Sequence, residues 1–124
     1  MIHEPPHFPA FQLQQLFRQY TFASSTEDEL QRAVAQCLDM NQIPYMREVR
    51  VSQTERPDFL IDTVAIEIKI GGSLSEVTRQ IHRYAQREDI QEILLVTTCA
   101  KHLDIPDEFN GKPMLALWIG GNAL

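Results

Sequence analysis

The sequence predicts an α/β fold in which a central mixed β-sheet is flanked by helices. Two short apolar strands meet at Asp62 and Thr63, so the middle of the chain should form a hairpin. One helix with a regular apolar stripe precedes this hairpin, and another follows it. A nearly continuous apolar run over 90–98 comes next, as expected of a parallel strand that is buried on both faces.

The size and charge of the chain limit its organisation. Its 124 residues are most simply one domain at 26–124, preceded by an N-terminal arm at 1–25 with room for a short helix. The formal net charge of −6 argues against a protein coated in basic surface. A local basic patch would still be compatible with binding to nucleic acid.

The sequence carries no sign of a membrane or secreted protein. No apolar run approaches the roughly 18 residues that span a bilayer, and the first residues lack the basic start and apolar core of a signal peptide. Cys37 and Cys99 lie in apolar segments without a Cys-x-x-Cys spacing, which favours reduced core thiols. We therefore expect a cytoplasmic protein with no membrane partner.

The N-terminal arm should begin as an extended segment, because residues 1–9 contain three prolines. Apolar residues at positions 11, 13, 16 and 17 then predict a short amphipathic helix that ends near Tyr20. This helix either packs on the domain or binds a partner, and it could supply a dimer contact.

The first long helix is predicted over 26–40. Thr26 and Glu29 form a capping box, so Glu29 should bond its own helix terminus. Glu27 shares the side of the helix that carries Leu30 and Val34. It could complement the helix dipole, or it could point toward the sheet as a third carboxylate of a site.

A strand is predicted over 45–51, between a loop at 41–44 and a turn at 52–55. It carries Arg47, Glu48 and Arg50, which an edge or half-solvated position would explain without a function. Glu48 could instead help to orient a metal ion or Lys69.

Charged residues on one face of the hairpin at 56–69 suggest a functional site. If the turn has two residues, Asp58 lies opposite Glu67, with Cβ atoms roughly 4.5–5.5 Å apart. Lys69 lies two residues beyond Glu67 and therefore on the same face. The turn is an unusual one, because Asp-Thr lacks the glycine that such turns prefer. The opposite face should be the core side, since it carries only apolar residues: Phe59, Ile61, Val64, Ile66, Ile68 and Ile70.

A second helix is predicted from 74 to about 86. Gly71 and Gly72 break the strand before it, and Ser73 with Glu76 forms a capping box at its start. Its apolar stripe is expected to pack on the sheet; the stripe consists of Leu74, Val77, Ile81 and Tyr84 or Ala85.

Polar residues of this helix face the end of the sheet at which the strand carrying Lys69 ends. Gln80 and Tyr84 are i, i+4 neighbours at the edge of the apolar stripe. A ridge of arginines at i, i+4 and i+8 lies next to them, formed by Arg79, Arg83 and Arg87. Such arginines are commonly a solvated face, but their position beside the carboxylates favours contact with phosphate.

The rest of the chain is predicted to hold a strand over 90–98, a loop over 99–111 and a last strand over 114–119. The segment 74–98 would complete a right-handed crossover between parallel strands. The loop contains His102, and the last strand could make a dimer contact.

Three short motifs occur along these elements: Pro57-Asp58, Glu67-Ile68-Lys69 and Gln80-Ile81-His82-Arg83-Tyr84. With the order helix, strand, strand, strand, helix, strand, they resemble the PD-(D/E)xK nuclease superfamily, whose restriction-endonuclease-like core is an αβββαβ unit. The Gln-x-x-x-Tyr element resembles the RecB and lambda-exonuclease branch in particular. The pattern is also similar to the small Holliday-junction resolvases. The resemblance covers roughly residues 26 to 98.

The resemblance implies a metal site and a catalytic lysine. Asp58 and Glu67 would hold one or two Mg²⁺ or Mn²⁺ ions together with the Ile68 carbonyl, which suits hard cations. Glu27 would be the first-helix acid, acting directly or through a water. Lys69 would position or deprotonate the attacking water, or stabilise charge that develops on the phosphate.

The resemblance also implies roles for the helix that follows. Gln80 and Tyr84 would orient Lys69 or touch the scissile strand. The phosphates of bound DNA would be contacted by Arg79, Arg83 and Arg87.

The implied function is that of a metal-dependent nuclease acting on DNA in recombination, repair or phage DNA metabolism. One alternative is a structure-specific endonuclease of the Holliday-junction type, for which a dimer would supply two active sites. Another is a nucleic-acid-binding module without turnover, against which the intact Asp58, Glu67 and Lys69 argue. Because the chain is acidic, we expect a homodimer or higher oligomer that builds a channel, or a partner protein that delivers the DNA.

Overall fold

The computed structural model describes residues 9–22, 25–47 and 56–120. The helices in this part of the chain are α1 (Ala10–Phe17), α2 (Glu27–Met40), α3 (Leu74–Tyr84) and the 3₁₀ helix η1 (Ala100–Asp104). The strands are β1 (Met46–Arg47), β2 (Phe59–Ile61), β3 (Val64–Lys69), β4 (Glu92–Thr97), β5 (Glu108–Phe109) and β6 (Lys112–Trp118). Glu48 and Arg50 of the predicted strand at 45–51 lie outside the described residues.

The described strands form one mixed sheet in the order β1-β2-β3-β4-β6-β5. Strand β2 runs antiparallel to both β1 and β3, whereas β3, β4 and β6 are parallel to one another. Helix α3 connects the parallel strands β3 and β4, as the predicted crossover requires. The predicted α/β class, with a mixed sheet flanked by helices, is confirmed.

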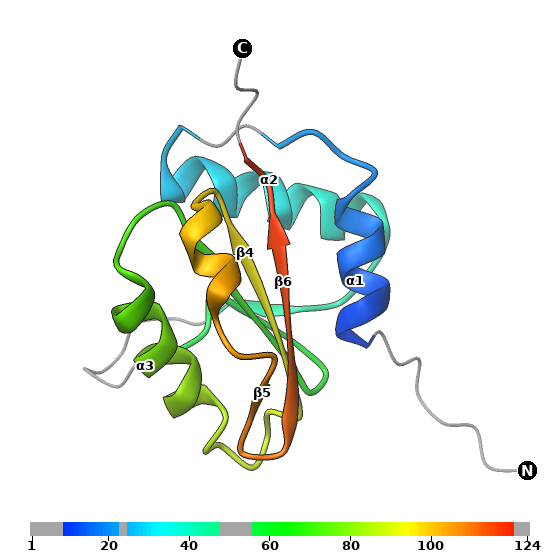
Figure 1. Ribbon diagram of the computed structural model, residues 1–124. Coiled ribbons are helices and arrows are strands. Elements are labelled where there is room, and N and C mark those ends of the chain that lie inside the picture. Colours follow the sequence, from blue (N-terminus) through cyan, green and yellow to red (C-terminus); the bar gives the residue numbers. More distant parts are fainter. Residues whose placement is uncertain (1–8, 23–24, 48–55, 121–124) are drawn as a thin grey trace, which may run out of the picture.

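Helices cover both faces of the sheet. Figure 1 shows α3 and η1 on one side of the strands and α1 on the other. Helix α2 shares the face of α1: Leu13 and Leu30 belong to the same buried cluster as Ile66 of β3. Val77 and Ile81 of α3 pack instead with Ala65, which points to the opposite face. Strand β3 is therefore buried on both faces, and its polar side chains lie beneath α3.

The two-residue turn of the hairpin is confirmed. Ile61 pairs with Val64 and Phe59 pairs with Ile66, which leaves Asp62 and Thr63 as the turn. Asp62 has a φ of 53°, in the left-handed region that short polar side chains tolerate better than most. Asp62 therefore adopts the backbone conformation that glycine usually occupies in such turns.

Helix α3 ends at Tyr84, two residues before the predicted end near 86. The Ala85 N–H still bonds four residues back, to Ile81, but the Gln86 and Arg87 N–H groups bond three residues back, to Arg83 and Tyr84. The last turn thus tightens and leaves the helix axis. Arg87 consequently lies beyond the helix that was predicted to carry it.

The prediction of a loop over 99–111 is wrong. This segment contains η1 and the short strand β5, which pairs with β6 through Phe109 and Lys112. Asn110 and Gly111 join the two strands with φ values of 52° and 75°. Positive φ at both positions is the turn for which Asn-Gly is preferred, so the dipeptide was a readable hairpin signal.

Helix α1, predicted to end near Tyr20, ends at Phe17 and packs on β4 and β6. Its Leu13 and Phe17 are fully buried. Gln14 Nε2 donates to the Ala116 carbonyl of β6 at 3.0 Å, which satisfies a backbone group of that strand. None of the helices at 9–22, 25–47 and 56–120 has the length and apolarity to cross a membrane.

Candidate active site

The hairpin and α3 bring the predicted catalytic residues together under one face of the sheet. Glu67 is buried, with 2% of its surface exposed. Its Oε2 lies 3.3 Å from Lys69 Nζ, and its Oε1 lies 3.0 Å from the Tyr84 hydroxyl. Both carboxylate oxygens of Glu67 are thus held by groups from the predicted motifs.

The Tyr84 hydroxyl connects α3 to both strands of the hairpin. It accepts a hydrogen bond from Gln80 Nε2 at 2.9 Å and also lies 2.9 Å from the Arg56 carbonyl. A phenol has one proton, so the Tyr84 hydroxyl donates either to the Arg56 carbonyl or to Glu67, but not to both at once. The contact with Arg56 fixes the segment that leads into Asp58.

Asp58 is anchored through both of its carboxylate oxygens. Oδ2 accepts the Ile68 N–H at 2.7 Å, and Oδ1 accepts from Gln31 Nε2 at 3.0 Å. The side-chain oxygen of Gln31 in turn accepts from Arg47 at 2.9 Å. Gln31 was not predicted as a site residue, because a polar residue on α2 gives no signal for a contact 27 positions away.

Burial raises the proton affinity of both acids. Desolvation raises the pKa of Glu67 to about 8, and the charge of Asp58 adds to this effect while Lys69 opposes it. Desolvation raises the pKa of Asp58 to about 6, against the stabilising Ile68 N–H. Glu67 is buried and Asp58 is half-buried, and the positive charges of Lys69 and Arg47 offset only part of the rise in their pKa values.

The two acids at the start of α2 have different surroundings. Glu29 accepts from the backbone N–H and the hydroxyl of Ser25, at 2.9 and 2.6 Å, and its own N–H bonds Thr26. Its carboxylate is thus occupied at the helix terminus. Glu27 is exposed, and its charge raises the pKa of Asp58. The exposed Glu27 does not share the burial of Leu30 and Val34, and within the described part of the chain it does not form a three-acid cluster with Asp58 and Glu67.

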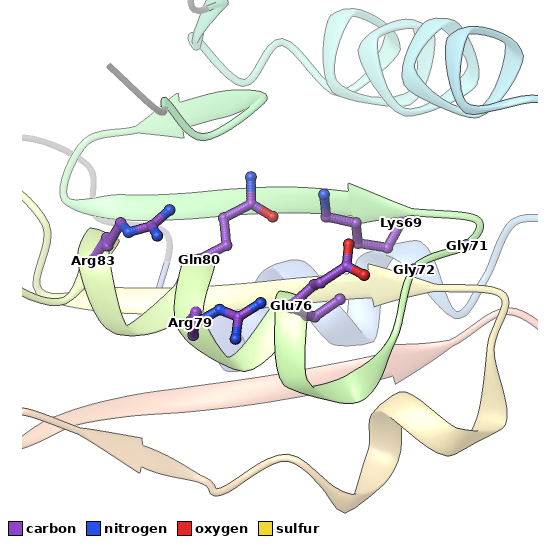
Figure 2. A pocket seen from close by; sticks show the side chains of 8 residues that line it. Lys69, Gly71, Gly72, Glu76, Arg79, Gln80 and Arg83 are labelled. Atoms are coloured by element: carbon purple, nitrogen blue, oxygen red, sulfur yellow. The ribbon is translucent and has the colours of Figure 1, made fainter. Parts of the chain in front are cut away.

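A groove of about 280 Å³ opens beside Lys69, the residue that contacts Glu67. Lys69 lines it at the end of β3, and α3 forms its other wall (Figure 2). The lining residues are Lys69, Gly71, Gly72, Glu76, Val77, Arg79, Gln80 and Arg83. Arg87 is not among them: its guanidinium forms two bonds with the Asp89 carboxylate, at 2.7 and 3.0 Å. The predicted arginine ridge is thus reduced to two members at this groove.

A buried histidine supports the glycine corner of the groove. His102 Nε2 lies 2.8 Å from the Gly72 carbonyl, and Nδ1 lies 2.6 Å from the Thr97 hydroxyl. Since a carbonyl can only accept, Nε2 carries a proton. Thr97 also accepts the Cys99 N–H at 3.0 Å. His102 therefore ties η1 to the turn that joins Lys69 to α3.

Comparison with known proteins indicates no function for the site. No family model, curated protein or solved structure matches the chain. Within 9–22, 25–47 and 56–120, no cluster of three or more His, Cys, Asp or Glu side chains is arranged to hold a metal. The carboxylates of the predicted motifs are those of Asp58 and Glu67, which lie behind Lys69, and the groove itself is lined by a third carboxylate, that of Glu76. Such a set suits Mg²⁺ or Mn²⁺, because Mg²⁺ commonly takes one or two carboxylates and keeps several waters.

The Ile68 backbone lies beside Asp58, because its N–H donates to Asp58 Oδ2 at 2.7 Å. In an antiparallel pair, the N–H and C=O of one residue point to the same neighbour. The Ile68 N–H points to Asp58, so its carbonyl faces the same segment. The β2–β3 pairing ends at Phe59, and Pro57 has no N–H to donate to a carbonyl. Asp58 and Glu67 are brought together beside Lys69, and the Ile68 carbonyl stays a predicted ligand.

Proposed function

We propose that the protein is a divalent-cation-dependent nuclease that hydrolyses phosphodiester bonds in DNA. The observation that carries the proposal is the pair of acids, Asp58 and Glu67, with pKa values raised by burial beside Lys69. An ionisable pair arranged in this way lowers stability, and acids with strongly perturbed pKa values beside a groove, here reached through Lys69, are candidates for a functional site. The two carboxylates are therefore better explained by binding of a cation than by a contribution to the stability of the fold.

The side chains divide the chemistry among them. A bound Mg²⁺ or Mn²⁺ would polarise the phosphate and lower the pKa of a coordinated water. Lys69 lines the groove next to Glu67, where its ammonium can orient a water or offset charge developing on the phosphate. Tyr84 and Gln80 hold the Glu67 carboxylate in one orientation.

The order of elements supports an assignment to the restriction-endonuclease-like core. Elements α2, β1, β2, β3, α3 and β4 follow one another as helix, strand, strand, strand, helix, strand. The three motifs of the PD-(D/E)xK resemblance contribute Asp58, Glu67, Lys69, Gln80 and Tyr84 to one contiguous network. This arrangement favours the nuclease over a binding module that lacks turnover.

The groove suggests how a nucleic-acid strand approaches the carboxylates. Arg79 and Arg83 line it along α3, one helical turn apart, and Lys69 lies at its end. Arginine forks match phosphate oxygens well. The chain has 17 Asp and Glu residues against 11 Lys and Arg residues, so a second copy or a partner protein would complete the DNA-binding surface.

The proposal is tested by a cleavage assay on linear, closed circular, single-stranded and branched DNA, with Mg²⁺ or Mn²⁺ and with EDTA. Cation-dependent hydrolysis of any of these substrates is the expected result. Degradation of linear DNA alone would indicate an exonuclease, whereas nicking of circles or resolution of junctions would indicate an endonuclease. Absence of cleavage on every substrate would contradict the proposal and favour a binding module.

Arg83→Ala should weaken DNA binding at every sequence and flatten its dependence on salt. Loss of one phosphate contact lowers the slope of log K against log salt by about 0.9. Fluorescence anisotropy at several salt concentrations measures this slope, with Arg18→Ala as the control. Arg18 is exposed at the end of α1, on the other side of the sheet. An unchanged slope in Arg83→Ala would show that the arginine is only a solvated surface residue.

A further inference from the structure

A chain of hydrogen bonds reaches Asp58 from two residues that were not predicted as site residues. It begins at Arg47 on β1, whose Nη2 donates to Gln31 Oε1 at 2.9 Å. Gln31, on α2, then donates from Nε2 to Asp58 Oδ1 at 3.0 Å. The chain thus ends on one of the two carboxylates of the proposed cation site.

Arg47 selects the orientation of the Gln31 amide. A guanidinium can only donate, so the oxygen of the amide must face Arg47 and its NH₂ group must face Asp58. Arg47 is itself held in place, because its guanidinium carbon lies 5.0 Å from the centroid of the Phe59 ring. Phe59 directly follows Asp58 in the chain. The contacts therefore close a ring that runs through Arg47, Gln31, Asp58 and Phe59.

The contact from Gln31 removes the rotational freedom of Asp58. One carboxylate oxygen is held by the Ile68 N–H and the other by the amide. Each oxygen keeps a further lone pair that no contact of the described residues uses. The carboxylate therefore presents its remaining lone pairs in one fixed direction, which is what a cation with strict geometry requires.

We propose that Gln31 is a positioning residue for Asp58, and that Arg47 acts through Gln31. This inference rests on the proposed function, because the ion held by Asp58 is the one that hydrolysis would require. Contacts that orient a metal ligand commonly change metal affinity or activity by about 10–100-fold when they are removed. A role in stability alone would leave the affinity for the ion unchanged.

The test is Gln31→Met, which keeps the length of the side chain and removes both hydrogen bonds. Calorimetric titration with Mn²⁺ should show an affinity about 10–100-fold lower than that of the wild type. Cleavage should recover at high Mn²⁺, with kcat restored. The matched control is Gln36→Met, an exposed glutamine on the same helix, which should bind Mn²⁺ like the wild type.

Arg47→Met provides a second variant on an exposed, two-residue strand. It should lower Mn²⁺ affinity by a smaller factor, and this effect should vanish in the Gln31→Met background, since both act through one amide. Unchanged Mn²⁺ affinity in both single variants, beside a wild type that binds Mn²⁺ and cleaves DNA, would overturn the positioning role alone. A wild type that binds no Mn²⁺ would overturn the proposed function and the positioning role together.

Discussion

Lys69→Met should reduce the rate of DNA cleavage by about 10²–10⁴-fold, the range expected for loss of a proton-transfer group or an electrostatic stabiliser. The ammonium of Lys69 lies 3.3 Å from Glu67 Oε2. Methionine keeps most of the side-chain volume but can neither donate a proton nor carry charge. The loss should appear in the single-turnover rate at saturating DNA and Mn²⁺.

Binding measurements separate this chemical effect from a structural one. Mn²⁺ affinity should be equal or higher in Lys69→Met, because the lysine competes with a cation for Glu67. DNA affinity should fall only modestly, since Arg79 and Arg83 also line the groove. Lys101→Met is the matched control, because Lys101 is exposed on η1 and does not line the groove. Full activity in Lys69→Met would remove the lysine from the proposed mechanism.

Glu67→Gln should stabilise the protein at pH 8 in the absence of divalent cations while abolishing cleavage. Burial raises the pKa of Glu67 from its ordinary value of 4.5 to about 8, so the folded state binds a proton that the unfolded state releases. The contribution of Glu67 to stability is therefore greatest below pH 4.5 and is lost as the pH rises from there through about 8. Asp58 loses stability in the same direction, from pH 3.8 through about 6. The amide neither ionises nor needs that proton.

Thermal unfolding in EDTA across pH 5–8 measures this difference. The melting temperature of Glu67→Gln should exceed that of the wild type by a margin that grows with pH. Each kcal/mol should shift the midpoint by about 4 °C in a domain of this size. Glu88→Gln serves as control, because Glu88 is exposed. Parallel pH profiles for wild type and Glu67→Gln would show that ionisation of Glu67 does not destabilise the folded protein. This result would weaken the case for a cation at this position.

The hairpin shows how far the sequence could predict the site. A two-residue turn and the alternation of strand residues were sufficient to place Glu67 and Lys69 on one face, and the register follows that prediction. The i, i+4 spacing of Gln80 and Tyr84 likewise predicted side chains that meet, at 2.9 Å. These contacts are local in sequence or follow from strand pairing, so periodicity encodes them.

Contacts between distant elements could not be predicted in this way. The bonds that link Arg47, Gln31 and Asp58 depend on how α2 packs beside the hairpin, and no periodic pattern records that packing. The same holds for His102, whose partners Gly72 and Thr97 lie on other elements. Helix α3 ends early because its last turn tightens. Arg87 then lies beyond the helix and pairs with Asp89.

The claim that most needs a direct test is that Asp58 and Glu67 bind a divalent cation. Calorimetric titration with Mn²⁺ at pH 7, in buffers of different ionisation enthalpy, counts the protons released on binding. With pKa values of about 8 for Glu67 and about 6 for Asp58, the pair should release about one proton for each Mn²⁺ bound. Glu67→Gln should bind more weakly and release almost none. Undetectable binding by the wild type, or binding whose proton release survives in Glu67→Gln, would contradict the cation site and the nuclease proposed from it.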